Sequence, residues 1–123
     1  MTEFLIGNSS EKEEIVDFIN YVFSQSRKPH DFKVLMPKSY ADNVKDLGAT
    51  HYLARQDGKI RAVVANRIIN VSVNENLLKF GLIGNVSVHP YSRGEGFMKK
   101  LINIAIDEAK QNGIDILVLG GQR

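Results

Sequence analysis

The stretch "VSVHPYSRGEGFMKKL", residues 86–101, joins two different hydrophobic periodicities through a glycine-rich turn. Alternating apolar residues before Pro90 predict a strand. After the turn, apolar residues share one helical face, chiefly Phe97, Leu101, Ile104, Ala105 and Ala109, widened by Met98, Ile102 and Ile106. Asn112 and Gly113 then supply a helix C-terminal stop. The sequence therefore predicts strand, tight turn and amphipathic helix, in that order.

A short apolar run, "IDILVLGG", follows this helix at once. A nearly continuous apolar run bounded by turn signals is typical of a strand covered on both faces. A strand, a helix and a second strand in succession predict a right-handed crossover with parallel strands.

Upstream, the pattern predicts an opening strand and then a helix over residues 11–23, with Ser10 and Glu13 in the spacing of a capping box. Residues 24–43 carry two prolines and no sustained period, which favours a loop with a short helix near Tyr40. A long irregular segment in a compact domain is often a binding loop.

The middle of the chain predicts a meander of three antiparallel strands. The first turn is Asp57-Gly58, a strong hairpin signal between apolar alternations, and the second is "VNEN", residues 73–76. The element order is therefore strand, helix, loop, three strands, helix and strand. This order predicts an α/β (α+β) domain with a mixed sheet of about five strands and flanking helices.

Length and composition bound the function classes. The 123 residues suffice for one domain, expected over 1–123, and the net charge of +2 gives no argument for a nucleic-acid partner. The chain has no cysteine, which fits a reducing cytoplasm and removes cysteine nucleophiles and cysteine metal sites. The acidic N-terminus and the short apolar runs predict no signal peptide and no membrane span. We expect a cytoplasmic protein without a metal site.

The glycine turn suits an anion. Backbone N–H groups at a helix N-terminus lack intrahelical partners, and Gly94 and Gly96 would let a phosphate approach them, with Arg93 adding a charged fork. The alternative is a tight turn with a solvated Arg93. Lys99 stands where a dinucleotide fingerprint needs a third glycine, and a P-loop would need Gly-Lys-Ser/Thr, which is absent.

A third pattern fits the whole stretch, V-x-V-x-P-x-x-R-G-x-G-x-x-x-x-L, carried here by Val86, Val88, Pro90, Arg93, Gly94, Gly96 and Leu101. It resembles motif A of the GNAT superfamily of N-acetyltransferases. The resemblance implies the acyl-CoA N-acyltransferase fold and acetyl-CoA as co-substrate. It also implies direct transfer of an acetyl group to an amine, without a covalent enzyme intermediate.

The resemblance also implies a cofactor site. Backbone groups of Val86, Ser87 and Val88 would pair with the pantetheine arm, and the amide of Val88 would face the thioester carbonyl as an oxyanion contact. The pyrophosphate loop would comprise Arg93, Gly94, Glu95, Gly96, Phe97 and Met98. Met98 stands where the family usually has Gly or Ala, so only its backbone amide is expected to serve. Phe97, Met98 and Leu101 are otherwise expected to be core residues.

A narrower likeness, in "RGEGFMKKL" and "LVLGGQR", is to the N-terminal acetyltransferase domain of Eis-type (enhanced intracellular survival) proteins. Those chains continue with a tyrosine-rich segment and further domains. This likeness implies a domain that is incomplete at its C-terminus, with a general base and general acid beyond Arg123.

The catalytic groups are not identified by the sequence. Many family members place a carboxylate on or near the fourth strand, where this chain has only Asn85, which cannot take a proton. His89 is a substitute that titrates near neutral pH, although a histidine beside a proline in an exposed turn is more often a surface residue. Lys99 and Lys100 form either a solvated helix face or a site for the 3′-phosphate of CoA.

Two functions therefore remain open. One is an acetyl-CoA-dependent N-acetyltransferase, or its cofactor-binding half, with a small-molecule or protein amine as acceptor. The other is a non-catalytic CoA-binding or oligomerising module of the same fold. The last strand would present an apolar edge, so we expect either a chain that is incomplete at its C-terminus or one that dimerises through this edge.

Overall fold

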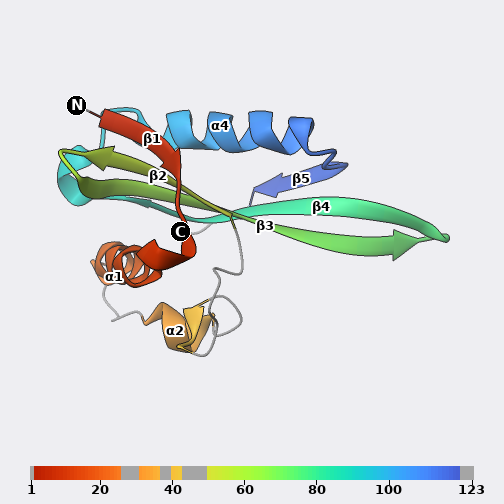
Figure 1. Cartoon of the computed structure of the whole chain (residues 1–123), viewed down its shortest axis with the longest axis horizontal. Coiled ribbons are helices and arrows are strands. Elements are labelled where there is room, and N and C mark those ends of the chain that lie inside the picture. The colour runs from red at the N-terminus through yellow and green to blue at the C-terminus, as the bar shows by residue number, and fades with distance from the viewer. Residues whose placement is uncertain (1, 26–30, 37–39, 43–49, 120–123) are drawn as a thin grey trace.

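A five-stranded mixed sheet forms the centre of the domain, with helices on both faces (Figure 1). The computed structural model describes residues 2–25, 31–36, 40–42 and 50–119. In chain order the elements are β1 (Thr2–Ile6), a 3-10 turn η1 (Ser9–Glu11), α1 (Lys12–Phe23), α2 (Phe32–Leu35), β2 (Thr50–Gln56), β3 (Lys59–Val73), β4 (Asn76–Val88), a 3-10 turn η2 (Pro90–Ser92), α4 (Phe97–Gln111) and β5 (Ile116–Leu119). The expected element order and fold class are confirmed.

The strands lie in the order β1-β2-β3-β4-β5, so neighbours in sequence are neighbours in the sheet. The first three pairs are antiparallel, and β4 and β5 are parallel, from Phe80 opposite Ile116 to Ile83 opposite Leu119. The crossover through α4 is therefore present as predicted. Figure 1 shows the hairpin of β3 and β4 projecting well past the rest of the sheet.

Both predicted hairpin turns are confirmed. Asp57 and Gly58 have φ of 54° and 80°, and Asn74 and Glu75 have φ of 49° and 70°. Two successive positive φ values match the right-handed twist of the flanking strands, and Asp, Asn and Gly tolerate them best.

The alternation of side chains along β2 and β3 gives the sheet two apolar faces. Leu53 and Val63 pack with α1 and α2, in a cluster completed by Ile15, Val16, Phe18, Ile19, Phe32, Tyr40 and Ile60. Their neighbours face α4, in a cluster of Tyr52, Ala54, Ala62, Val64, Ile83, Phe97, Leu101 and Ala105. Figure 1 shows α1 and α4 on opposite sides of the sheet. None of the described helices has the length and apolar character needed to span a bilayer.

A capping box is present before the first helix, but the predicted pair of residues is wrong, because the box begins two residues earlier. Asn8 accepts a hydrogen bond from the amide of Ser10 at 3.0 Å, and Glu11 accepts one from the amide of Asn8 at 3.0 Å. Ser10 and Glu13 are therefore not the capping pair. Because a 3-10 turn precedes α1, the cap closes that turn rather than the α-helix itself.

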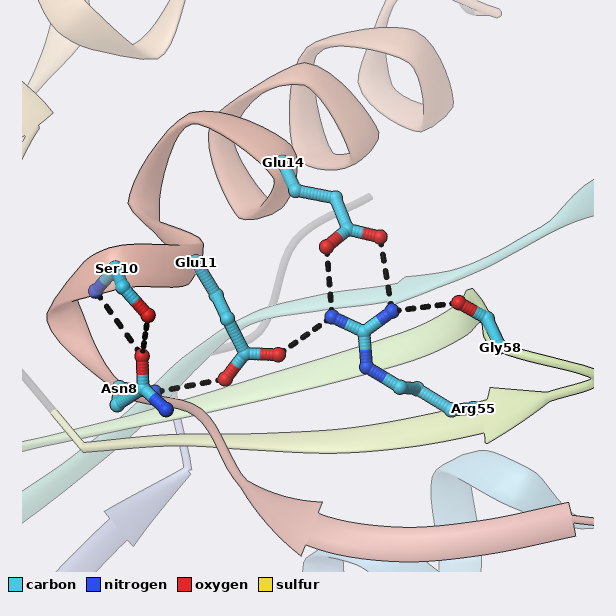
Figure 2. Close-up of polar contacts among 6 residues, drawn as sticks. All are labelled: Asn8, Ser10, Glu11, Glu14, Arg55 and Gly58. Carbon is cyan, nitrogen blue, oxygen red and sulfur yellow. Dashed lines mark hydrogen bonds and ion pairs between the residues drawn. The ribbon is translucent and has the colours of Figure 1, made fainter.

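Arg55 of β2 links the start of α1 to the sheet through ion pairs and hydrogen bonds (Figure 2). Its guanidinium donates to both carboxylate oxygens of Glu14, at 2.9 and 2.7 Å, and to Glu11 at 2.5 Å. It also donates to the carbonyl oxygen of Gly58 at 2.8 Å. Hydrogen bonding to Arg55 holds the pKa of Glu14 below its ordinary value. The planar fork of arginine suits this two-oxygen contact.

Two burial expectations are wrong. The last strand was expected to be covered on both faces, yet Ile116, Val118 and Leu119 are exposed, because in the described residues α4 covers β2 and β3 more than β5. Met98 was expected in the core, yet 47% of its surface is exposed, since the core face of α4 starts from Phe97 and Leu101.

The segment over residues 24–43 contains the helix α2, capped by Asp31, whose side chain accepts from the amide of Lys33. Tyr40 is itself helical, as the sequence indicated, and α2 is an additional helix earlier in the segment. The amide of Tyr40 donates to the carbonyl of Met36 at 3.0 Å, so Tyr40 continues one helical hydrogen bond beyond α2. Residues 26–30, 37–39 and 43 of this expectation lie outside the described residues.

Replacing Arg55 tests its role as the fastening between α1 and β2. Arg55→Met leaves two carboxylates without their charged donor, so we expect the free energy of unfolding to fall by about 1 to 3 kcal/mol, measured by urea denaturation. Lys33→Met is the control, because Lys33 pairs only with the exposed Glu13 and Asp42. Solvent screening should make its loss smaller. Equal losses in the two variants would contradict the assignment.

Candidate functional site

A β-bulge interrupts the pairing of β3 and β4 just before the predicted site. Val63 lies opposite Ser87, whereas Ala65 lies opposite Gly84, so residues 85 and 86 together face Val64. The extra residue reverses the alternation of side chains. In a regular strand, Ile83 would share its face with residues 85 and 87. Because of the bulge, Ile83 instead shares the face toward α4 with Val86 and Val88.

Asn85 takes the conformation that this bulge requires. Its φ is 50°, in the left-handed region, which asparagine adopts more readily than other residues with a Cβ. Its side-chain amide donates to the hydroxyl of Tyr40 at 2.8 Å and lies 3.5 Å from Sδ of Met36. The bulge is therefore fixed from the α2 side of the sheet.

Beyond the bulge, β4 keeps only one strand partner among the described residues. Pairing with β5 ends at Ile83 opposite Leu119, while pairing with β3 continues to Val88 opposite Ala62. In the described part of the chain, the edge of residues 84–88 that faces β5 thus has no strand beside it. Unpaired strand groups can hydrogen-bond an extended ligand.

The glycine turn has the backbone that the sequence predicted. Gly94 and Gly96 have φ of 90° and 79°, and an added Cβ would meet nothing within 4 Å at either position. The turn therefore needs glycine for its conformation and leaves open space beside its backbone.

The turn leads directly into α4. Gly96 is the N-cap residue, and no side chain caps the helix there. The first intrahelical hydrogen bond in this turn runs from the amide of Lys100 to the carbonyl of Gly96 at 3.1 Å. The amides of residues 97–99 thus lie at the positive end of the helix dipole without an intrahelical acceptor.

The predicted loop residues separate into two groups. Phe97 is buried under the sheet, and its ring meets that of Phe4 edge to face at 6.0 Å. The others are exposed: Arg93, Gly94, Glu95, Gly96 and Met98. On the preceding strand, Ser87 is buried and donates to the carbonyl of Asn85 at 3.1 Å, while Val86 and Val88 are partly buried.

The basic residues beside the loop are also exposed. Lys100 already makes a cation–π contact, because its Nζ lies 5.7 Å from the centre of the Phe4 ring. In the described part of the chain Lys99 makes no such contact, so of the two lysines it is the better candidate for binding an anion.

His89 caps the 3-10 turn after β4. Its Nδ1 accepts from the amide of Tyr91 at 3.1 Å, and its ring stacks on Tyr21 with centroids 5.5 Å apart. Burial, and then the charge of Arg61, lower the pKa of His89, so the ring is neutral at pH 7. These contacts give His89 a structural role at the end of the strand.

Sequence reasoning missed the network of Tyr40, His51 and Asn85. Tyr40 and His51 are fully buried, with the hydroxyl 2.7 Å from Nε2 of His51. In the sequence, His51 lies 11 residues from Tyr40 and Asn85 lies 45 residues from it. The bulge in β4 directs the Asn85 side chain toward Tyr40. No local sequence signal reports such contacts. Among the described residues, no cluster of three or more His, Cys, Asp or Glu could hold a metal ion.

Comparison with known proteins gives one family. Residues 6–121 match the family described as "Acetyltransferase (GNAT) domain". No curated protein matches the sequence significantly.

Solved structures share the fold at low sequence identity. The chain is similar to an acetyltransferase of Clostridium acetobutylicum solved with acetyl-CoA, at TM-score 0.78 and 20% identity, over 100% of this chain and 82% of that one. A ribosomal-protein-alanine N-acetyltransferase from Brucella melitensis gives 0.71 and 22%, over 100% and 82%. Glucosamine-6-phosphate N-acetyltransferase from Arabidopsis thaliana gives 0.68 and 21%, over 99% and 83%.

The positive φ angles make a direct test of the glycine turn. In Gly96→Ala the methyl group meets no neighbour but must adopt a left-handed conformation, so we expect unfolding to become easier by about 1 to 2 kcal/mol. Gly84→Ala is the matched control, since it too has open space but no positive φ. Denaturant titration of both variants measures the difference. A Gly96→Ala variant as stable as Gly84→Ala would refute the described turn.

Proposed function

The chain belongs to the GNAT acetyltransferase domain family, and from this premise we propose that it transfers an acetyl group from acetyl-CoA to an amine by direct attack. The observation that carries the proposal is the juxtaposition along one stretch of chain. A strand edge that has no partner strand among the described residues, a left-handed glycine turn and an uncapped helix N-terminus follow one another over residues 84–99.

These features fit the parts of acetyl-CoA in turn. The edge of β4 at Val86, Ser87 and Val88 offers backbone donors and acceptors for the amides of the pantetheine arm. The open space at Gly94 and Gly96 and the amides that begin α4 suit the pyrophosphate. Exposed Arg93 supplies a forked, permanently charged donor to the same anion.

Acetyl-CoA would supply an acetyl group activated as a thioester. Transfer forms a bond between the amine nitrogen and the acetyl carbon while the carbon–sulfur bond breaks, with one proton leaving the amine and one reaching the thiolate. In the proposed site the amide of Val88 stabilises charge on the carbonyl oxygen, and the strand edge orients the reactants.

A second function has one observation in its favour. β4 contains no Asp or Glu, and the neutral His89 is engaged through Nδ1 with Tyr91. A non-catalytic CoA-binding or oligomerising domain needs no general base, so this arrangement is compatible with it. Turnover with an amine separates the two functions, because binding alone is common to both.

The narrower relationship to the N-terminal domain of Eis-type proteins is part of the proposal, supported by the "RGEGFMKKL" turn and helix start. We also propose a cytoplasmic location, on the ground of the cysteine-free composition. The acceptor is an amine of a small molecule or of a protein side chain.

Calorimetric titration tests the cofactor proposal. We expect acetyl-CoA and CoA to bind and NAD not to bind, because the turn lacks the third glycine of a dinucleotide fingerprint. Arg93→Glu should weaken both CoA ligands about tenfold or more, since it replaces a donor to the pyrophosphate by a repelling charge.

Lys110→Glu is the matched control for this charge reversal. Lys110 is an exposed residue in the last turn of the same helix, and a helix of 15 residues separates its two ends by about 22 Å. The control should bind CoA with nearly the wild-type affinity. Binding of NAD without CoA, or equal weakening in both variants, would overturn the proposed site.

The exposed outer strand supports a proposal about assembly. Ile116, Val118 and Leu119 of β5 are exposed at the last strand of the described sheet, so we propose that this edge pairs with a second copy of the chain. Val118→Lys should convert the dimer to a monomer, measured by size-exclusion chromatography with light scattering. A wild-type protein that elutes as a single monomeric species would refute this proposal.

A further inference from the structure

Two fully buried polar side chains, Tyr40 and His51, meet the partly buried Asn85 at the bulge of β4, on the face opposite α4. The hydroxyl of Tyr40 lies 2.7 Å from Nε2 of His51, and the side-chain amide of Asn85 donates to the same hydroxyl at 2.8 Å. Tyr40 and His51 have no exposed surface. Polar groups buried this deeply are costly unless each finds a partner, so this network is highly constrained.

The direction of the hydrogen bonds follows from the donors available. An amide nitrogen can only donate, so the Tyr40 oxygen accepts from Asn85 and its own proton is free to bind Nε2 of His51. Burial raises the pKa of Tyr40 to about 12, which keeps that proton in place at neutral pH. His51 is thereby assigned as an acceptor at Nε2.

The network acts on the least favourable backbone position of β4. Asn85 has φ of 50°, a left-handed conformation that costs a residue with a Cβ of the order of 1 kcal/mol. In this conformation the side-chain amide of Asn85 donates to the hydroxyl of Tyr40. The next three residues are those whose backbone would contact the pantetheine arm and the thioester.

We propose that Tyr40, held by His51, is a positioning residue for acetyl transfer: it fixes Asn85 in the left-handed conformation and so sets the course of the β4 edge at Val86, Ser87 and Val88. The inference rests on the proposed function, because the edge matters only if it receives acetyl-CoA. Neither Tyr40 nor His51 contacts the reacting atoms.

Tyr40→Phe removes the hydroxyl and keeps the ring. Tyr52→Phe is the matched control, because Tyr52 is also buried, and burial likewise raises its pKa to about 12, but it packs with α4 on the other face of the sheet. We expect both variants to lose some stability toward urea. Only Tyr40→Phe should weaken acetyl-CoA binding, by about fivefold to tenfold.

A backbone readout separates positioning from general loosening. The carbon chemical shifts of Asn85 report its φ and ψ, and Tyr40→Phe should move them away from left-handed values while Tyr52→Phe leaves them unchanged. Adding Asn85→Gly to Tyr40→Phe should restore part of the affinity, because glycine adopts positive φ without help. Restoration would not follow if Tyr40 served stability alone.

The possible failures are distinguishable. A wild-type chain that does not bind acetyl-CoA refutes the proposed function, and unchanged Asn85 shifts in Tyr40→Phe refute the positioning role whatever the ligand does. Equal acetyl-CoA affinities of Tyr40→Phe and Tyr52→Phe would also overturn it. If Tyr40→Phe does not fold, Asn85→Ala and Asn85→Gly give the same test, with weaker binding expected only for alanine, and equal binding would refute the inference.

Discussion

The pairing of β4 with two neighbours over different lengths is the constraint on which the rest of the structure depends. β4 is bonded to β3 from its start to Val88, but within the described residues, which end at Leu119, its pairing with β5 extends only to Ile83. The length of α4 accounts for where β5 begins. A helix of 15 residues returns the chain by about 22 Å, the length of roughly seven strand residues. Counted back from Val88, seven residues reach Gly81, which is next to Phe80, where pairing with β5 starts.

The same geometry brings together the elements that the proposed chemistry needs. The tight turn after β4 places the N-terminus of α4 next to the end of the β4 edge that has no partner strand among the described residues. The backbone amides of the strand edge and those of the first helical turn therefore lie close together. The bulge at Asn85 keeps Val86 and Val88 packed toward α4, which leaves their backbone, rather than their side chains, for a ligand. Apolar packing and ligand contact are thereby assigned to different atoms of the same residues.

Much of this arrangement is predictable from sequence, because local rules govern it. Asp57-Gly58 and the glycine turn specify positive φ, and the apolar spacing after Phe97 specifies the buried face of α4. The rest depends on tertiary context. The apolar run of β5 does not indicate that its side chains are exposed in the described structure. Met98 is also exposed, because it lies at the border of the buried face of α4. From the sequence, Asn85 is noted only as the position where other family members have a carboxylate. Its role at the bulge depends on the register shift between β3 and β4, which the sequence of β4 alone does not indicate.

The most direct test of the central claim is a titration of isotopically labelled protein with acetyl-CoA, followed through the backbone amide resonances. The account predicts that the largest shifts fall on two separate groups, residues 86–88 at the edge of β4 and residues 94–98 in the turn and the start of α4. Small and uniform shifts, or changes concentrated on the β3–β4 hairpin tip or on α1, would contradict it.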